Sequence, residues 1–267
     1  MIIFPNAKIN LGLKVINRRD DGYHNIETVL YPINIKDALE IVEFKELQFS
    51  YSGIKIPASP GDNLCMRAWH LIAGDFGLPN VHMHLHKQIP IGAGLGGGSS
   101  DAAFCIRLIN DKFNLGLSIS QMQDYARQLG SDCAFFINNT PVMASGKGDV
   151  LSNIHVTLKN YYLILVMPPI QISTLRAYQG VMPGLTNFDP RLPETLAVEE
   201  WRNFLVNDFE KSVFKINPEI KKIKEFLYNH GALYASMSGS GASVYGIFKQ
   251  EIKLPELQQH NFVFYDI

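Results

Sequence analysis

Cysteine is scarce in this chain. Only three occur among 267 residues, at positions 65, 105 and 133, and no C-x-x-C pair appears. An odd, widely spaced set argues against a disulfide framework and against a structural zinc site, and it fits the reducing cytosol. We therefore expect a cytoplasmic protein without disulfides.

The sequence also lacks long hydrophobic runs and an excess of charge. Its longest strongly apolar stretch, residues 161–167, is far shorter than the about 20 residues of a membrane span. The first residues, M-I-I-F-P-N-A-K, lack the charged and apolar regions of a secretory signal. Lys plus Arg number 24 and Asp plus Glu number 25. This balance excludes a broad nucleic-acid-binding surface, although a local cationic pocket stays possible. We expect neither a membrane nor a nucleic acid as partner.

The remaining composition is that of a folded protein. Hydrophobic residues make up 46% and charged residues 18%, which excludes disorder. The length predicts one or two domains. A chain of this size buries roughly three-quarters of its unfolded surface, so it needs no metal or disulfide to fold.

Strand and helix patterns alternate along the chain and predict a mixed α and β class. We place a domain boundary near residue 150, where the composition shifts weakly. Ser120 is expected to cap a helix that Gly130 ends, and residues 186–200 are expected to be loop with some helix. The predicted strands are residues 8–15, 26–30, 38–44, 81–87, 156–167 and 244–248, and the predicted helices are 64–76, 100–113, 120–130 and 218–228.

The most informative segment is P-I-G-A-G-L-G-G-G-S-S-D-A-A, residues 90–103, between a predicted strand and a predicted helix. Glycine permits positive φ and lacks a Cβ, so backbone N–H groups can converge on an anion. A helix N-terminus adds unpaired N–H groups and a positive dipole end. The combination predicts a phosphate site, to which the hydroxyls of Ser99 and Ser100 could contribute.

Two other interpretations of this glycine-rich loop stay open. The P-loop pattern fails because no lysine follows the glycines. The dinucleotide pattern G-x-G-x-x-G does match at Gly92, Gly94 and Gly97, but the required acidic residue, Asp111, falls inside a helix pattern. A flexible loop without a ligand is the third interpretation.

Several single residues are ambiguous on local sequence alone. Lys8, in P-N-A-K-I-N-L, reads as an exposed strand lysine, and Asp132, in G-S-D-C-A-F-F, reads as a helix cap. The segment S-M-S-G-S-G-A-S, residues 236–243, either approaches a ligand or forms a tight turn. His82, His84 and His86 share one strand face, about 6.5–7 Å apart. We interpret them as a solvated or half-buried sheet face, with a metal site as the alternative.

Taken together, the motifs resemble a known family. Residues 5–11, 90–103 and 238–243 resemble the three signatures of the GHMP kinases in order and spacing. Residues 18–24 (R-R-D-D-G-Y-H) and 130–136 resemble the members that act on a cytidine-diphosphate-linked methylerythritol in non-mevalonate isoprenoid synthesis. The resemblance implies an α+β, two-domain GHMP-kinase-like fold with the active site in the cleft between the domains. Residues 1–150 would form the ATP-binding domain and residues 151–267 the C-terminal domain.

The resemblance also implies an activity and a set of site residues. The enzyme would transfer the γ-phosphate of ATP, with Mg²⁺, to the 2-hydroxyl of this small-molecule substrate. Lys8 and Asp132 take the catalytic positions, Asp132 as base or orienting group and Lys8 as charge stabiliser. The expected ATP-binding residues are Pro90, Ile91, Gly92, Ala93, Gly94, Leu95, Gly96, Gly97, Gly98, Ser99 and Ser100, with Asn63 near the adenine and Lys87.

For the substrate, the resemblance implies five residues. Asn10, Tyr23 and His24 match positions that line the substrate pocket. Tyr23 suits stacking on a nucleobase, and His24 would then contact the edge of the cytosine. Tyr178 is the candidate for the opposite face of the base, and Thr174 lies nearby in sequence. We name no metal ligand beyond Ser99 or Ser100 and expect a monomer or a weak homodimer.

Two alternatives remain at this point. One is a related kinase that acts on mevalonate, homoserine or a sugar. The other is a catalytically inactive sensor of ATP and a metabolite, against which the presence of both Lys8 and Asp132 argues.

Overall fold

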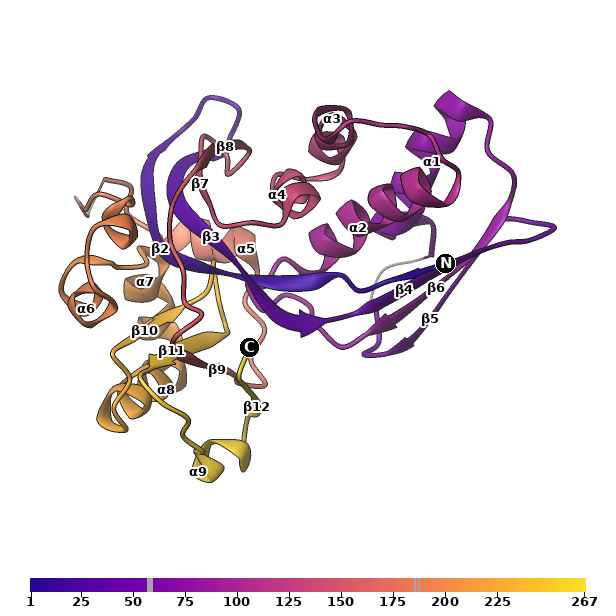
Figure 1. Ribbon diagram of the computed structural model, residues 1–267. Coiled ribbons are helices and arrows are strands. Elements are labelled where there is room, and N and C mark those ends of the chain that lie inside the picture. The colour runs from indigo at the N-terminus through magenta and orange to yellow at the C-terminus, as the bar shows by residue number, and fades with distance from the viewer. Residues whose placement is uncertain (57–59, 185, 187) are drawn as a thin grey trace. The chain divides into compact units, whose positions relative to one another are not determined.

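The computed structural model describes residues 1–56, 60–184, 186 and 188–267. The chain forms two compact units, and neither is a continuous stretch of sequence (Figure 1). The predicted boundary near residue 150 stays a prediction. Unit 1 contains Met1–Ala7, Ile35–Ile91 and Gly96–Thr140, and unit 2 contains Lys8–Asn34, Gly92–Leu95 and Pro141–Ile267.

Unit 1 is built on a four-stranded sheet. Strand β6 lies between β4, with which it pairs antiparallel, and β5, with which it pairs parallel. Along β6, Val81, Met83 and Leu85 are fully buried, whereas the alternate histidines are half-buried. This confirms the predicted alternation. In spatial order, the strands are β1 (Ile2–Ile3), β4 (Ala38–Glu43), β6 (Val81–Lys87) and β5 (Gln48–Gly53).

Helices cover one face of this sheet (Figure 1). The predicted helix 64–76 is confirmed, with Asn63 as its cap and Gly77 in the left-handed region at its end. The predicted cap Ser120 is wrong: Ser118 caps α3, because Gln121 lies three residues further and completes a capping box. The helices are α1 (Leu64–Phe76), α2 (Gly97–Lys112), α3 (Ile119–Leu129) and α4 (Cys133–Asn138).

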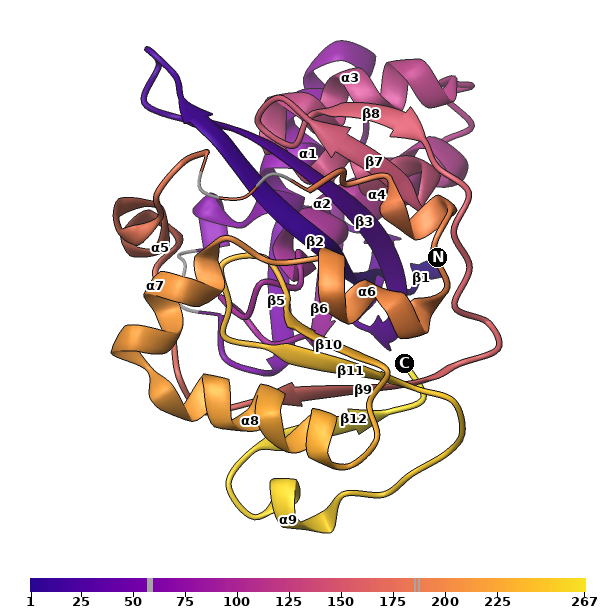
Figure 2. The ribbon, with the colours of Figure 1, turned by 90° about the vertical axis from the view of Figure 1, so that its left-hand side faces the viewer.

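Unit 2 contains two antiparallel sheets. Helix α8 packs on the C-terminal sheet (Figure 2), and the core beneath it includes Leu13, Val15 and Phe209. In spatial order, the C-terminal sheet is β10 (Tyr234–Met237), β11 (Val244–Phe248), β9 (Tyr162–Met167) and β12 (Phe262–Tyr265). The other sheet is β2 (Asn6–Arg18), β3 (His24–Lys36), β7 (Val142–Ser145) and β8 (Val150–Asn153).

Shorter elements complete unit 2. The predicted helix 218–228 is confirmed with one residue more at its end. In residues 186–200, two 3₁₀ helices interrupt loop, as predicted, and residue 187 lies outside the described residues. The helices are α5 (Thr174–Gly180), α6 (Trp201–Phe204), α7 (Phe209–Ile216), α8 (Pro218–Asn229) and α9 (Pro255–Gln258).

One predicted strand begins later than expected. The pattern predicts a strand over 156–167, but β9 begins at Tyr162. Residues 158–161 form a turn instead, in which Tyr161 N–H donates to Leu158 C=O over 3.0 Å. Leu158 is buried although it lies outside the sheet, so its apolar character supported a strand that the turn residues Lys159 and Asn160 prevent.

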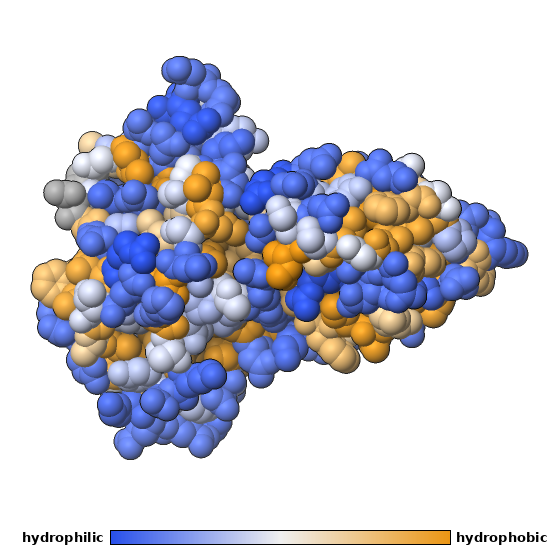
Figure 3. Space-filling view, turned by 45° about the horizontal axis from the view of Figure 1, so that its top comes forward, coloured by the Kyte–Doolittle hydropathy of each residue, from blue (hydrophilic) through white to orange (hydrophobic). Residues whose placement is uncertain are grey.

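The surface carries no continuous apolar band in the view of Figure 3, where hydrophilic and hydrophobic residues are interspersed. In the described part of the chain, no helix is both long and apolar enough to span a bilayer.

Candidate active site

Lys8 is a buried lysine of β2 whose ammonium is bound by neutral oxygens of unit 2. Its Nζ donates to Asn10 Oδ1 over 2.7 Å and to the Gly94 carbonyl over 3.2 Å. The backbone joins the same two segments, because Lys8 N–H donates to Leu95 C=O over 3.0 Å. The side chain is 4% exposed, so the interpretation as an exposed strand lysine is wrong. The first half of the glycine-rich loop is thus bonded to the predicted catalytic lysine.

A second layer of hydrogen bonds supports Asn10. Its Nδ2 donates to Thr28 Oγ1 over 3.0 Å, and the Thr28 hydroxyl donates to the Gly12 carbonyl over 2.5 Å. Gly12 has φ of +69° in the middle of β2, a conformation that favours glycine. Thr28 was not singled out from the sequence, since a threonine in a strand is ordinary.

The two glycine-rich segments of unit 2 contact each other. Ser238 Oγ donates to the Gly94 carbonyl over 2.9 Å, and Ser243 N–H donates to the Ala93 carbonyl over 3.3 Å. Gly94 has φ of +77°, and a Cβ there would collide with the Ser238 carbonyl. Close packing therefore explains Gly94, and the Gly94 carbonyl accepts from both Ser238 and Lys8.

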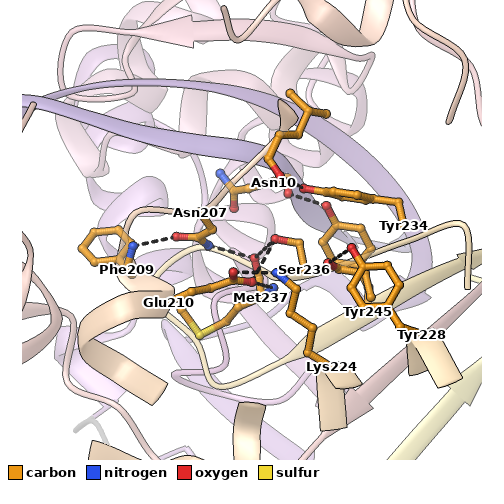
Figure 4. Close-up of polar contacts among 12 residues, drawn as sticks. Asn10, Asn207, Phe209, Glu210, Lys224, Tyr228, Tyr234, Ser236, Met237 and Tyr245 are labelled. Atoms are coloured by element: carbon orange, nitrogen blue, oxygen red, sulfur yellow. Dashed lines mark hydrogen bonds and ion pairs between the residues drawn. The ribbon is translucent and has the colours of Figure 1, made fainter. Parts of the chain in front are cut away.

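Two buried polar side chains of residues 207–210 (N-D-F-E), Asn207 and Glu210, hold residues 237–239 in place (Figure 4). Asn207 Nδ2 donates to the carbonyls of Met237 and Gly239, each over 2.8 Å. Glu210 Oε1 accepts from Met237 N–H over 2.9 Å, and its Oε2 pairs with Lys224 over 2.6 Å. Charge-assisted bonds such as these are stronger than neutral ones. Sequence reasoning missed this cluster, although Asn207 and Asp208 directly before α7 and Glu210 in its first turn are a detectable signal.

The second half of the glycine-rich loop belongs to unit 1. Gly96 has φ of +70° and precedes α2, which begins at Gly97 rather than at the predicted Ser100. A Cβ on Gly97 would lie 2.8 Å from Ile89 and 2.9 Å from Lys87 Nζ. Glycine there lets α2 begin early, directly after the loop, and leaves the N–H groups of its first turn at the loop.

Further predicted ATP residues lie just before α2 or in its first turn. Pro90 and Ile91 connect β6 to the loop. A Cβ added to Gly98 would lie 3.7 Å from the Leu64 side chain, which is an ordinary contact distance. Ser99 is half-buried. Ser100 is fully buried, and its Oγ has no hydrogen-bond partner among the described residues.

Lys87, a predicted ATP residue, lies in a buried ion cluster of unit 1. Its Nζ pairs with Asp37 and, over 2.9 Å, with Asp101. Asp37 also accepts from the N–H groups of Gln88 and Ile89, over 2.5 and 2.8 Å. Burial raises the pKa of Asp101 to about 8, although Lys87 opposes this. Asp37 was not singled out from the sequence, because its partners are distant along the chain.

Asp132 occupies the residue before α4 in unit 1, and its side chain makes no capping hydrogen bond to that helix. The simple cap interpretation is therefore wrong. The next residue, Cys133, is buried, and burial raises the pKa of its thiol to about 12. Cys133 is thus an inert neighbour, because only thiolates are strong nucleophiles. The pairing of Asp132 with Lys8 stays a prediction.

Two of the five predicted substrate residues, His24 and Tyr178, bring their aromatic rings together in unit 2. The His24 ring stacks on Tyr178 with centroids 4.7 Å apart and an angle of 22°. Tyr178 in turn meets Phe209 edge-on at 4.8 Å. Burial, followed by the charge of Arg18, lowers the pKa of His24, so its neutral form is favoured. Tyr23 is 59% exposed.

Two other predicted residues have local partners. Thr174 Oγ1 lies 3.3 Å from Ser240 Oγ in the C-terminal glycine-rich segment. Asn63 Oδ1 accepts from Cys65 N–H over 2.8 Å, so it caps α1. A contact of Asn63 with adenine stays a prediction.

The histidine row of β6 forms a hydrogen-bonded ladder with serines of β5. Ser50 Oγ lies 2.7 Å from His82 Nε2 and 2.8 Å from His84 Nδ1. Ser52 Oγ lies 2.9 Å from both His84 Nε2 and His86 Nδ1. The residues that the structure describes contain no group of three or more His, Cys, Asp or Glu suited to a metal ion. The ladder is a half-buried sheet face, as predicted.

Family models define the class of protein. Residues 63–140 match the GHMP kinases N terminal domain, and residues 181–261 match the GHMP kinases C terminal model. A solved mevalonate kinase from Methanococcus jannaschii shares the fold, with a TM-score of 0.73 at 15% identity, and the match covers 99% of this chain and 97% of that one. The α+β GHMP kinase fold is therefore confirmed.

Closer relatives narrow the class. A 4-diphosphocytidyl-2-C-methyl-D-erythritol kinase of Azobacteroides pseudotrichonymphae is 51% identical over 98% of this chain and 100% of its own length. A kinase of the same name from Cytophaga hutchinsonii is 53% identical, over 93% and 92%. A crystal structure of 4-(cytidine 5'-diphospho)-2C-methyl-D-erythritol kinase has a TM-score of 0.82 at 28% identity, covering 99% and 98%. The chain belongs to the 4-diphosphocytidyl-2-C-methyl-D-erythritol kinase family of the GHMP kinases.

Proposed function

We propose that this chain is an ATP-dependent kinase that phosphorylates the 2-hydroxyl of 4-diphosphocytidyl-2-C-methyl-D-erythritol in isoprenoid precursor synthesis. Relatives of that name match nearly the whole chain. The observation that carries the proposal is the bond from Lys8 to the Gly94 carbonyl, which ties a buried ammonium to the glycine-rich loop. Since Cys65, Cys105 and Cys133 are free thiols, we assign the reaction to the reducing cytoplasm.

The loop is proposed to bind the phosphates of ATP. Backbone N–H groups of a glycine-rich loop and the start of a helix favour anions. Residues 92–100 supply both features, with positive φ at Gly92, Gly94 and Gly96 and the start of α2 at Gly97. Asn63 and Lys87 are proposed to lie at the nucleotide, and the carboxylates beside Lys87 would hold it in place.

Mg²⁺ is proposed to accompany ATP. Magnesium prefers oxygen ligands and commonly binds one or two protein groups together with substrate phosphates. The hydroxyls of Ser99 and Ser100 fit this preference, because Ser100 Oγ has no hydrogen-bond partner among the described residues. When bound, the ion would offset negative charge on the phosphates.

Lys8 and Asp132 are proposed to act on the reacting groups. Phosphoryl transfer passes through a loose transition state, so positioning and charge stabilisation supply most of the rate enhancement. The Lys8 ammonium would stabilise charge on the transferring phosphoryl group. Asp132 would orient the 2-hydroxyl and take its proton, a role that contributes typically ~10²–10⁴-fold.

The aromatic group of unit 2 is proposed to bind the cytosine. Each base stacked on an aromatic ring gains about 1–3 kcal/mol. Tyr23 is exposed and Tyr178 already stacks on His24. A neutral His24 both donates and accepts a hydrogen bond, which suits the edge of a cytosine. Asn10 and Thr174 are proposed to contact the rest of the substrate.

The test is release of ADP from MgATP by the purified protein. We expect turnover with the cytidylylated substrate and none with mevalonate, homoserine or a sugar. Asp132→Asn should lower kcat ~10²–10⁴-fold. CDP and an ATP analogue should each raise Tm separately, because ligands that bind only the native state stabilise it. Turnover of mevalonate or homoserine instead would contradict the proposal, and binding without turnover would favour the sensor.

A further inference from the structure

We propose that Thr28 is a positioning residue for Lys8 and acts through Asn10. This inference rests on the proposed function, because it concerns the lysine that the phosphoryl group would approach. The chain of contacts runs through unit 2 alone: Lys8 Nζ to Asn10 Oδ1, Asn10 Nδ2 to Thr28 Oγ1, and Thr28 Oγ1 to the Gly12 carbonyl.

The direction of each hydrogen bond follows from the inventory of donors and acceptors. A backbone carbonyl only accepts, so the single proton of the Thr28 hydroxyl points to Gly12 C=O, 2.5 Å away. The hydroxyl can then only accept from the Asn10 side chain. Its partner must be the amide nitrogen, at 3.0 Å, and the amide oxygen must face Lys8. Thr28 therefore holds Asn10 in the amide orientation that the Lys8 ammonium requires, with Oδ1 toward Nζ.

Burial makes this selection consequential. Lys8, Asn10 and Thr28 are 4%, 3% and 1% exposed. Solvent cannot readily replace a lost partner at such positions, so an unsatisfied group retains its full cost. Gly12, at which this series of hydrogen bonds ends, is closely packed as well. A Cβ on Gly12 would lie 3.1 Å from the Phe188 ring and 3.5 Å from Leu205.

Removal of the hydroxyl should release the amide. In Thr28→Val, the side-chain shape is kept, but Asn10 Nδ2 loses its acceptor. The unsatisfied NH₂ group can then turn toward another acceptor, and this movement draws Oδ1 away from the ammonium. Lys8 would shift toward its other acceptors. Phosphate binding by the backbone of the loop would be unaffected, so the loss should fall on kcat.

The experiment compares three variants with the wild-type enzyme at saturating MgATP and substrate. Thr28→Val should lower kcat about tenfold to a hundredfold, as displacements near 1 Å do, with little change in the KM for ATP. Thr28→Ser keeps the hydroxyl and should restore most of kcat. The matched control is Tyr245→Phe, which removes a buried hydroxyl that donates over 2.8 Å to the backbone carbonyl of Asn10. It leaves the amide orientation alone, so its kcat should equal that of the wild type.

A double-mutant cycle decides whether Thr28 acts through Asn10. Asn10→Ala should lower kcat, and adding Thr28→Val to it should cause no further loss, because the amide to be oriented is gone. Additive losses would overturn the inference, and so would a Thr28→Val enzyme with wild-type kcat. A wild-type protein without turnover would instead overturn the proposed function.

A measurement on the wild-type protein covers the case in which Thr28→Val does not fold. The two Nδ2 protons of Asn10 should exchange slowly with solvent in NMR spectra, since they are buried and bonded to Thr28. Rapid exchange of these protons in the folded enzyme would contradict the proposal.

Discussion

Two buried lysines of this molecule are held in opposite ways. In unit 1, two carboxylates, Asp37 and Asp101, surround the ammonium of Lys87. In unit 2, the neutral oxygens of Asn10 and Gly94 accept from Lys8. Both side chains are about equally buried, at 3% and 4% exposure.

The difference lies in what the partners do to the charge. Burial disfavours the charged form of Lys87, but Asp101 and Asp37 outweigh it and hold its pKa above the usual lysine value. Its charge is balanced inside unit 1, where it joins β6 to α2. Amide and carbonyl oxygens orient Lys8 without adding a formal charge of their own. The carboxylates thus fix Lys87 between β6 and α2 of unit 1, whereas the oxygens of Asn10 and Gly94 are the partners that unit 2 supplies to Lys8.

Removing Lys87 should have the largest effect on stability. Lys87→Met leaves Asp37 and Asp101 buried without their cation, which should lower the free energy of unfolding by about 3–5 kcal/mol. Urea unfolding measures this loss. Lys253→Met serves as control, since the Lys253 side chain is 60% exposed and should change stability little. Equal stability of the two variants would contradict the structural role.

Removing the proposed catalytic lysine should affect rate more than stability. Lys8→Met should lower kcat about 10²–10³-fold, as the loss of one transition-state donor does. Its two neutral acceptors would lose a donor, at a cost of about 1–3 kcal/mol each at most. Steady-state kinetics and urea unfolding on the same preparation test both parts. A Lys8→Met enzyme with near wild-type kcat would contradict the proposed catalytic role of Lys8.

The Gly94 carbonyl, which accepts from Lys8, can be tested with a matched pair of glycines. Gly92 and Gly94 have φ of +70° and +77°, so alanine costs about 1–2 kcal/mol at either position. Gly94→Ala also collides with the Ser238 carbonyl, whereas no atom of the described residues lies within 4 Å of a Cβ on Gly92. Gly94→Ala should therefore be less stable than Gly92→Ala by about 1–3 kcal/mol. Thermal unfolding compares them, and equal losses would argue against tight docking of the two segments.

A further prediction concerns the pH dependence of the ion cluster. Burial raises the pKa of Asp101 from 3.8 to about 8. The folded state therefore holds a proton that the unfolded state has released, and this contribution to stability is lost as pH rises toward 8. Asp101→Asn cannot titrate, so it should remove a slope of at most about 1.4 kcal/mol per pH unit. Urea unfolding between pH 5 and 9 tests this, at roughly unit steps. An unchanged slope would show that Asp101 stays ionised.

Local patterns predicted much of the fold. Helix 64–76 and strands 81–87 and 244–248 have the expected bounds, because alternation and capping residues lie within each segment. The start of α2 was missed because Gly97 is required by Ile89 and Lys87, residues of the preceding strand and loop. The close contact of these two side chains with the Gly97 position is not visible in the sequence pattern of the helix itself.

The site was predictable only where its residues form motifs. The glycine-rich loop and Lys8 are recognisable together, and the structure bonds them in unit 2. Thr28, in β3, and Asp37, between β3 and β4, belong to no motif that the local sequence reveals. The hydrogen-bond partners of Asp37 lie 50 to 52 residues away along the chain. Thr28 and Asn10 are 18 residues apart. Their importance follows from pairing across strands, which one-dimensional patterns do not encode.

The anchoring of β2 affects the order in which the protein can be assembled on the ribosome. Val15 N–H donates to Asp208 over 2.7 Å across 193 residues, and Leu13 forms a bridge with Asn207. At synthesis rates of about 5–20 residues per second, the first strand waits roughly 10–40 s for these partners. Unit 1 is fully synthesised by residue 140. During translation the early apolar strand is therefore a natural client for chaperones until the last third of the polypeptide emerges.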